Sequence, residues 1–352
     1  MKLPEKLTGM TPYQPTTERY PIRLDANESF LPLPEEKRSA LAAAVAEAVA
    51  FNRYPDPLAR ALCAAAADYY GVPETCVTAG NGSDELISVL MNTFLPRGGR
   101  VLVTEPDFSM YAFYAGLAEA EVTVLPKREG AFTADELIEK AAEAKPDMVL
   151  FSNPCNPTGR GLPRGDVLRV IGEIDALVVV DEAYMEFWDQ SVLPEAVGAE
   201  NAIVLRTCSK ALGLAAARVG FAVACGRLTG YLRAAKSPFN VNTLSQIAGE
   251  LVLRDKAAIR GNIAAILKSR DALTKDLAAL AARHPDALEV FPCVTNFVLA
   301  KPRDAAAMQQ ALRERGVCVR LLGDCLRITA GSEEENGTFL RELEILLEKG
   351  GD

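Results

Sequence analysis

Short apolar runs that alternate with helical stretches constrain the fold of this chain more than any other feature. The runs end near Thr104, Leu125, Ser152, Asp181, Arg206 and Ala224. Strands that alternate with helices are typical of an α/β domain built on a parallel sheet. Ligand sites of such sheets gather at the carboxyl ends of the strands. The sequence therefore predicts an α/β fold with a binding site along one edge of its sheet.

The pattern changes after about residue 255. A long Ala- and Leu-rich helical stretch is followed by short apolar runs at residues 295–299, 317–321 and 326–329. Ser332 and Glu335 have the spacing of a capping box at the start of a last helix. A length of 352 residues and a hydrophobic fraction of 49% suit about two domains. We therefore expect a second, smaller α+β domain at the C-terminal end.

Lys210 lies between Ser209 and Ala211, after the apolar run 202–205 and eight residues before Arg218. A lysine held in a dry pocket near other cations can lose its proton and attack a carbonyl carbon. A hydrated lysine in a solvated loop is the alternative interpretation.

Asp181 follows the branched apolar run 177–180, and Tyr184 comes three residues later. An aspartate at the tip of a buried strand stays ionised when it meets a cation, such as a protonated ring nitrogen. Tyr184 would then reach a hydroxyl group on the same ring. The alternative is that Asp181 caps the following turn.

Two Asn-Pro pairs lie within residues 153–159, directly after the apolar run 148–151. Proline fixes its own φ and moves the preceding residue out of the α region, so this segment is a rigid extended turn. Its asparagine amides suit a ring oxygen or a carboxylate. A plain turn is the alternative.

The segment Gly-Asn-Gly-Ser-Asp-Glu at residues 80–85 precedes an apolar helical stretch, with Ser83 near the expected N-cap. Free backbone N–H groups and the positive end of a helix dipole favour an anion such as phosphate. The segment lacks the lysine of a Walker loop and the third glycine of a dinucleotide fingerprint. A simple capped turn is the alternative.

Phe108 follows the strand that ends near Thr104, at an expected junction between a strand and a helix. A flat ring at this place would stack on a flat cofactor. Packing in the core is the alternative, since phenylalanine is usually buried.

Together these residues resemble the pyridoxal-phosphate aminotransferases of fold type I, and among them the histidinol-phosphate aminotransferases. The resemblance covers most of the chain, with its motifs in one order: residues 24–28, 53–57, 80–85, 106–111, 153–159, 181–184, 206–211, 213–218 and 326–329. It implies pyridoxal 5'-phosphate as cofactor and a mainly parallel, seven-stranded sheet. It also implies a large domain at residues 45–254 and a small α+β domain formed by residues 1–44 and 255–352.

The resemblance implies a role for each matching position around the cofactor. Lys210 would bind the cofactor covalently, Asp181 would pair with its pyridine nitrogen, and Phe108 would stack on its ring. Tyr184 and Asn156 would bind the ring oxygen. The cofactor phosphate would be held by Ser83, Asp84, Thr207, Ser209 and Arg218, the first two largely through their backbone.

The resemblance also implies a homodimer with shared active sites, because Tyr54 would reach the phosphate of the neighbouring subunit. Arg327 would bind the anionic group of the substrate as a bidentate fork. Asn156, Arg320 and Tyr13 would contact the substrate too, the last two chiefly at a larger phosphate group. Only six residues separate Arg320 from Arg327, so we expect a short loop over the substrate phosphate and a displaced Arg320.

Composition excludes several other classes of protein. The chain has 38 basic and 47 acidic residues, a net charge of −9 and no basic block, which argues against nucleic acid as a partner. No apolar run has the length of a signal peptide or membrane span, so we expect a cytoplasmic protein that does not bind membranes. Eight cysteines without CxxC pairs and a single histidine, His284, predict neither disulfides nor a metal site. With so little histidine, the amine of Lys210 is the expected acid and base.

The sequence thus predicts an aminotransferase that moves an amino group between histidinol phosphate, or a similar small-molecule amino donor, and a 2-oxo acid, the 2-oxoglutarate/glutamate pair, by a ping-pong mechanism. One alternative is a lyase like threonine-phosphate decarboxylase, which shares nearly all of these motifs. Another is a protein that binds the cofactor without catalysis. Such regulators usually carry a DNA-binding module, for which this chain has no spare length.

Overall fold

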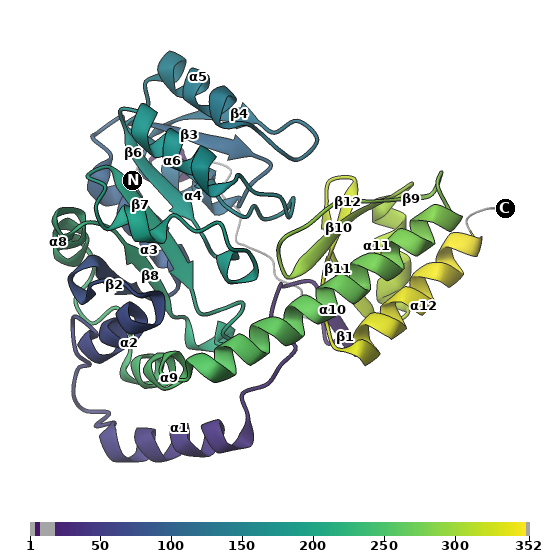
Figure 1. The fold of residues 1–352 in the computed structure, drawn as a ribbon, viewed down its shortest axis with the longest axis horizontal. Helices are drawn as coiled ribbons and strands as arrows, with labels where there is room; N and C mark the ends of the chain where they lie inside the picture. Colours follow the sequence, from purple (N-terminus) through teal and green to yellow (C-terminus); the bar gives the residue numbers. More distant parts are fainter. Residues whose placement is uncertain (1–3, 8–17, 350–352) are drawn as a thin grey trace.

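The computed structural model describes residues 4–7 and 18–349, which form two sheets linked by a long helix (Figure 1). The larger sheet has seven strands in the order β2-β8-β7-β6-β5-β3-β4. Only β8 pairs antiparallel with its neighbours, so the predicted mainly parallel sheet is confirmed. Its strands are β2 (Val77–Gly80), β3 (Arg100–Glu105), β4 (Glu121–Pro126), β5 (Met148–Ser152), β6 (Leu177–Asp181), β7 (Ala202–Thr207) and β8 (Gly220–Val223).

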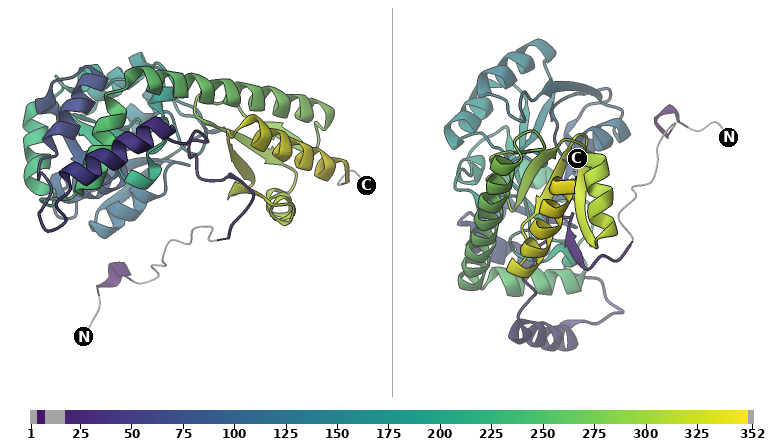
Figure 2. Two further views of the ribbon diagram at one scale, coloured as in Figure 1. Left: turned by 90° about the horizontal axis from the view of Figure 1, so that it is seen from below. Right: turned by 90° about the vertical axis from the view of Figure 1, so that its right-hand side faces the viewer.

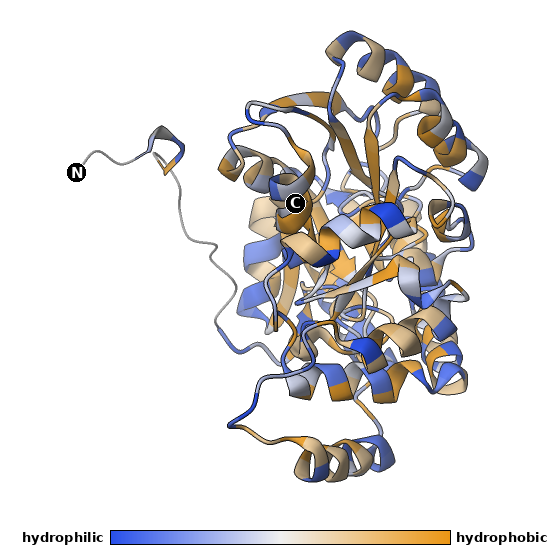
Figure 3. Ribbon diagram, turned by 90° about the vertical axis from the view of Figure 1, so that its left-hand side faces the viewer, coloured by the Kyte–Doolittle hydropathy of each residue, from blue (hydrophilic) through white to orange (hydrophobic). Residues whose placement is uncertain are grey.

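Helices cover both faces of the larger sheet, because its strands are apolar on both sides. Figure 3 shows these strands in the colour of hydrophobic residues. Side chains of α3 (Ser83–Phe94), α4 (Met110–Leu117) and α8 (Gly226–Ala235) pack on one face. The other face packs against α2 (Arg60–Tyr70), α5 (Ala134–Ala144), α6 (Arg164–Glu173) and α9 (Thr243–Leu253). The short turns η2 (Glu74–Cys76), η3 (Met185–Phe187), η4 (Ala215–Ala217) and helix α7 (Leu193–Ala196) lie in the connections.

The sequence pattern located six of the seven strands but not β2. This strand has only four residues, Val-Thr-Ala-Gly, and its burial is complete. A run this short, which ends in alanine and glycine, carries too weak a β-signal to be separated from a turn.

The smaller sheet has five strands in the order β1-β11-β12-β10-β9. Its strands are β1 (Ile22–Leu24), β9 (Leu288–Val290), β10 (Phe297–Pro302), β11 (Val317–Leu322) and β12 (Cys325–Thr329). Buried side chains of this sheet pack against α10 (Lys256–Arg283), α11 (Ala305–Glu314) and α12 (Glu333–Lys349). Ser332 and Glu335 form the expected capping box, each side chain accepting from the other's backbone N–H at 3.2 and 2.7 Å.

Helix α10 belongs to both parts and spans the space between them (Figure 2). Ile259 and Ile266 lie in the core of the large sheet, whereas Leu273 and Leu277 lie in the core of the small one. The N-terminal residues contribute β1 to the small sheet, while α1 (Glu35–Ala48) contacts α9 and η1 (Glu5–Leu7) binds near the end of α4 through Lys6. No described helix is both long and apolar enough to cross a membrane.

Candidate functional site

The predicted motifs meet at the carboxyl edge of the large sheet, because parallel strands end at the same edge. Phe108 follows β3, Asn156 follows β5, Asp181 ends β6, and Lys210 follows β7. Successive side chains of β6 point to opposite faces of the sheet, and this alternation decides the face on which Asp181 lies. Val178 and Val180 pack on the side of α6, whereas Val179 packs on the side of α4, as does Asp181 through a hydrogen bond to that helix.

Asp181 is 4% exposed and has only neutral hydrogen-bond donors. Tyr111 Oη donates to Oδ2 at 2.8 Å, and the backbone N–H of Ala183 donates to Oδ1 at 3.0 Å. Burial raises the pKa of Asp181 to about 6, although both hydrogen bonds act against the rise. No ion pair of Asp181 occurs among the described residues. The carboxylate is therefore arranged to receive a cation from a ligand.

Lys210 is partly buried and its Nζ donates to the backbone oxygen of Ala26 at 2.9 Å. Loss of solvent, together with the nearby cations Arg327 and Arg218, lowers the pKa of Lys210 to about 8. An appreciable fraction of this amine is unprotonated near neutral pH, which a nucleophilic lysine needs. The amine lies 5.9 Å from the centre of the Tyr184 ring.

A cradle for an anion lies at the first turn of α3. A Cβ atom on Gly82 would come within 2.6 Å of Arg218 Nη2, so glycine lets the guanidinium lie against this helix end. Arg218 Nη1 also donates to Ser209 Oγ at 3.2 Å, and Thr207 Oγ1 donates to the same oxygen at 3.0 Å. The guanidinium, these hydroxyls and the free N–H groups of the helix end, which include that of Ser83, form a donor set that fits a phosphate group.

Asp84 lies in the same helical turn, but its side chain points to a tyrosine. Tyr114 Oη donates to Asp84 Oδ2 at 3.3 Å, and burial raises the pKa of Asp84. Its carboxylate is a poor phosphate ligand, which leaves the backbone N–H as the group available to an anion.

The hydroxyl of Tyr184 is held in place by a residue that is far away in the sequence. Its hydroxyl accepts a hydrogen bond from Asn27 Nδ2 at 2.8 Å, and the Asn27 backbone N–H donates to Thr329 Oγ1 at 2.9 Å. Asn27 therefore connects the N-terminal segment, the small sheet and the loop after β6. No role was predicted for Asn27, although it lies within residues 24–28, one of the motifs of the family resemblance.

The two Asn-Pro pairs have different surroundings. Asn156 accepts a hydrogen bond from Arg327 through its side-chain oxygen and donates from its backbone to Ser152 Oγ at 3.3 Å. The side-chain amide of Asn153 instead binds the backbone of Leu162: its Oδ1 accepts from the Leu162 N–H at 2.7 Å, and its Nδ2 donates to the Leu162 oxygen at 3.1 Å. Asn153 thus stabilises the turn, and only Asn156 faces the other candidate residues.

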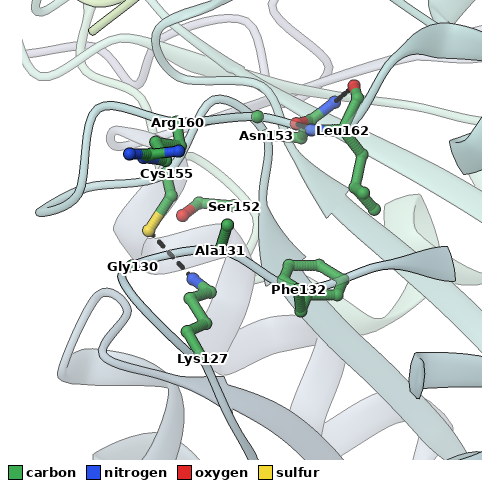
Figure 4. Close-up of a pocket in the computed structure, with 10 residues that line it drawn as sticks. Lys127, Gly130, Ala131, Phe132, Ser152, Asn153, Cys155, Arg160 and Leu162 are labelled. Carbon is green, nitrogen blue, oxygen red and sulfur yellow. Dashed lines mark hydrogen bonds between the residues drawn. The ribbon is translucent and has the colours of Figure 1, made fainter. Parts of the chain in front are cut away.

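A buried cluster beneath the site fixes the loops that carry Phe108 and Asn156. Lys127 donates to Asp107 Oδ2 at 2.8 Å, to the Pro106 oxygen at 2.9 Å and to Cys155 Sγ at 2.9 Å. Figure 4 shows Lys127 and Cys155 facing each other beside a small pocket. Asp107 also accepts from the Phe108 backbone N–H at 2.8 Å. We interpret this cluster as structural, since its charges are paired with each other.

Arg327 and Arg320 come from the small sheet and face each other across a hairpin. They are direct partners in the antiparallel pairing of β11 with β12, and Gly323 and Asp324 form the turn. Direct partners lie on the same face of a sheet, so the short connection keeps both arginines on one face. Arg327 is 8% exposed and donates from Nη2 to the Asp25 backbone oxygen at 2.7 Å.

Tyr54, one of the predicted cofactor-binding residues, lies apart from the other candidate residues. Tyr54 is 81% exposed and stacks on Phe239 with 4.6 Å between ring centroids. Within the described residues, no hydrogen bond or ring contact joins Tyr54 to the anion cradle. Tyr13 lies outside the described residues. Among residues 4–7 and 18–349, no group of histidine, cysteine and carboxylate side chains has the arrangement of a metal site.

The combination of this fold with a lysine, a buried aspartate and an anion cradle at one sheet edge is that of the fold type I pyridoxal-phosphate-dependent transferases. The chain belongs to the family of class I and II aminotransferases, whose sequence model matches residues 20–343.

Known relatives cover nearly the whole chain. A histidinol-phosphate aminotransferase of Clostridium novyi is 41% identical over 331 residues, 92% of this chain and 91% of the relative. The solved structure of histidinol-phosphate aminotransferase from Sinorhizobium meliloti, in complex with pyridoxal-5'-phosphate, has a TM-score of 0.85 at 21% identity and covers 94% of this chain and 92% of that one. L-threonine-O-3-phosphate decarboxylase from Porphyromonas gingivalis has a TM-score of 0.79 at 25% identity, over 93% of this chain and 99% of that one.

Proposed function

We propose that this protein is a pyridoxal-phosphate-dependent aminotransferase that moves an amino group between histidinol phosphate and 2-oxoglutarate in a ping-pong cycle. The observation that carries the proposal is that Lys210, with its lowered pKa, shares one sheet edge with the unpaired carboxylate of Asp181 and with the anion cradle. The high identity to a histidinol-phosphate aminotransferase over most of the chain supports the choice of substrate.

The bound cofactor supplies an aldehyde that accepts amines and a ring that withdraws electrons from the reacting carbon. Arg218, Ser209, Thr207 and the first turn of α3 would hold its phosphate. Asp181 would keep a proton on the ring nitrogen, because an ionised carboxylate in a dry site stabilises a nearby cation.

The remaining groups act on the substrate side. When the amino donor takes its place, the amine of Lys210 would be free to act as general base and general acid. It would remove the proton from the carbon that bears the amino group and return it to the carbon of the cofactor aldehyde. Tyr184 and Asn156 would bind the ring oxygen, and Phe108 would exclude water from one face of the ring. Arg327 would bind the anionic group of either amino donor, the carboxylate of glutamate or the phosphate that takes its place in histidinol phosphate. Arg320, on the same face of the sheet, would chiefly bind the larger phosphate.

A two-substrate assay tests this proposal. Purified protein should convert 2-oxoglutarate to glutamate with histidinol phosphate as donor, and should release no carbon dioxide from threonine phosphate. Lys210→Ala protein, prepared in parallel, controls for contaminating transaminases. Carbon dioxide release without amino transfer would favour the decarboxylase instead, and failure with both substrates would indicate another amino donor.

We also propose a homodimer in which Tyr54 reaches the cradle of the neighbouring subunit. In its own chain Tyr54 has an exposed ring, and its hydroxyl forms no hydrogen bond within the described residues. Mixing Tyr54→Phe with Lys210→Ala subunits should partly restore activity, since hybrid dimers hold one intact site. Subunit exchange without any recovery would show that each chain uses its own tyrosine. The cytoplasmic location expected from the sequence stays a prediction.

A further inference from the structure

Tyr111 touches both residues that the proposed function places against the cofactor ring. It lies on α4 and is 1% exposed. Its hydroxyl donates to Asp181 Oδ2 at 2.8 Å, and its ring meets that of Phe108 edge-on, with 5.6 Å between centroids and 82° between planes. Burial and the charge of Asp181 raise the pKa of Tyr111 well above its usual value, so this phenol remains a donor.

We propose that Tyr111 is a positioning residue that holds Asp181 ionised and correctly oriented with its hydroxyl and holds Phe108 with its ring. The inference rests on the proposed function. Asp181 has no cationic partner among the described residues, and its other donor is the backbone N–H of Ala183. Tyr111 is therefore the side chain through which the chain itself sets the protonation of Asp181, because a hydrogen bond to the ionised form lowers a carboxyl pKa.

A tyrosine that only filled the core would tolerate loss of its hydroxyl. Tyr111→Phe keeps the ring and removes the donor, whereas Tyr111→Leu removes both. Tyr114→Phe is the matched control, since Tyr114 lies on the same helix but donates to Asp84 at 3.3 Å. These variants separate the hydroxyl from the ring and Asp181 from another carboxylate.

The first measurement is a ¹³C NMR titration of the Asp181 carboxyl carbon in the cofactor-free full-length protein, with Asp181→Asn to assign the signal. In Tyr111→Phe the pKa of Asp181 should rise above its value of about 6, by about one unit for the loss of one of its hydrogen-bond donors. Tyr114→Phe should leave it unchanged. An unaltered Asp181 pKa in Tyr111→Phe would overturn the positioning role.

The second measurement is cofactor affinity, followed by visible absorbance on addition of pyridoxal phosphate. Tyr111→Phe should bind the cofactor several-fold more weakly and lower kcat by about tenfold with little change in KM, since one pKa unit corresponds to a factor of about ten. Tyr111→Leu should lower both cofactor affinity and kcat further, because it also removes the ring that packs against Phe108. Unchanged cofactor affinity in both variants would overturn the role even if the Asp181 pKa shifts. Absence of cofactor binding by wild type would instead overturn the proposed function, and the NMR titration distinguishes that failure because it needs no cofactor.

Discussion

Asp181 and Glu182 are adjacent buried carboxylates with opposite surroundings. Alternation at the end of β6 turns them to opposite faces of the sheet. Asp181 meets only neutral donors on the side of α4, whereas Glu182 pairs with Arg206 at 2.8 Å on the side of α2. Arg206 also pairs with Glu186 at 3.0 Å, and Ser191 and the Val192 N–H complete the bonds of Glu182.

Under the proposed function, this difference is one between a functional carboxylate, Asp181, and a structural one, Glu182. A buried charge that is fully paired maintains the fold, and its loss costs stability. A buried charge without a cation costs stability in the empty protein and becomes useful only when a ligand supplies the cation.

Lys210→Ala should lower amino transfer by about a thousandfold or more, since the amine serves as both nucleophile and proton carrier. Borohydride should attach pyridoxal phosphate to wild type at Lys210 alone, as located by peptide mass spectrometry. Lys127→Met is the control, because Lys127 is a buried lysine that pairs with Asp107, so its loss should affect stability rather than attachment of the cofactor. Labelling at another lysine would defeat the assignment.

Asp181→Asn should bind the cofactor but lower the rate of proton abstraction by about a hundredfold or more, because an amide cannot keep the ring nitrogen protonated. Single-turnover absorbance changes with each amino donor would measure this step. A variant within about tenfold of wild type, only ~1.4 kcal/mol, would contradict the role.

Glu182→Gln should lower the free energy of unfolding by about 3 kcal/mol, because it leaves a buried Arg206 with one charged partner fewer. Urea unfolding followed by circular dichroism measures the loss. Where the variant is folded, its proton-abstraction rate should stay within about tenfold of wild type. A larger loss of rate without loss of stability would place Glu182 on the functional side of the contrast.

Removing the charge of Asp181 should have the opposite effect on the stability of the cofactor-free protein. Its pKa is raised to about 6 from an ordinary value of 3.8, so the folded state binds the proton more tightly than the unfolded state does. The stability that comes from this tighter proton binding is fully present below about pH 4 and is lost as the pH rises through about 6. Asp181→Asn has no ionisable group at this position and is not destabilised in this way. Its free energy of unfolding, relative to that of wild type, should therefore be about 2–3 kcal/mol higher at pH 7.5 than at pH 4. An equal difference at both pH values would show that Asp181 titrates normally.

Arg327→Ala should weaken both amino donors, whereas Arg320→Ala should weaken histidinol phosphate by about tenfold more than glutamate, since one charged contact to the larger phosphate is lost. Apparent dissociation constants from single-turnover spectra test this difference. Equal losses for both donors in Arg320→Ala would remove its proposed contact with the phosphate.

Much of this protein could be predicted from local sequence. Apolar runs show where most strands end, and glycine, proline and asparagine show where the backbone must turn. Because parallel strands end at one edge, the residues after those runs, among them Lys210, Asp181 and Asn156, could be expected to meet. The anion cradle followed from the glycines before α3 in the same way.

Contacts between distant segments were decided by the tertiary structure alone. Nothing local indicates that Asn27 donates to Tyr184, that Tyr111 donates to Asp181, or that Asn153 is used within its own turn. The register of β11 on β12 also decided that Arg320 faces the same side as Arg327. The physical reason is that sequence patterns record each residue's own backbone preference and burial, whereas the partner of a polar side chain depends on how separate elements pack. Local sequence patterns thus show which residues reach the carboxyl edge of the sheet, whereas the packing of the elements decides that Glu182 is paired with a cation there and that Asp181 meets only neutral donors.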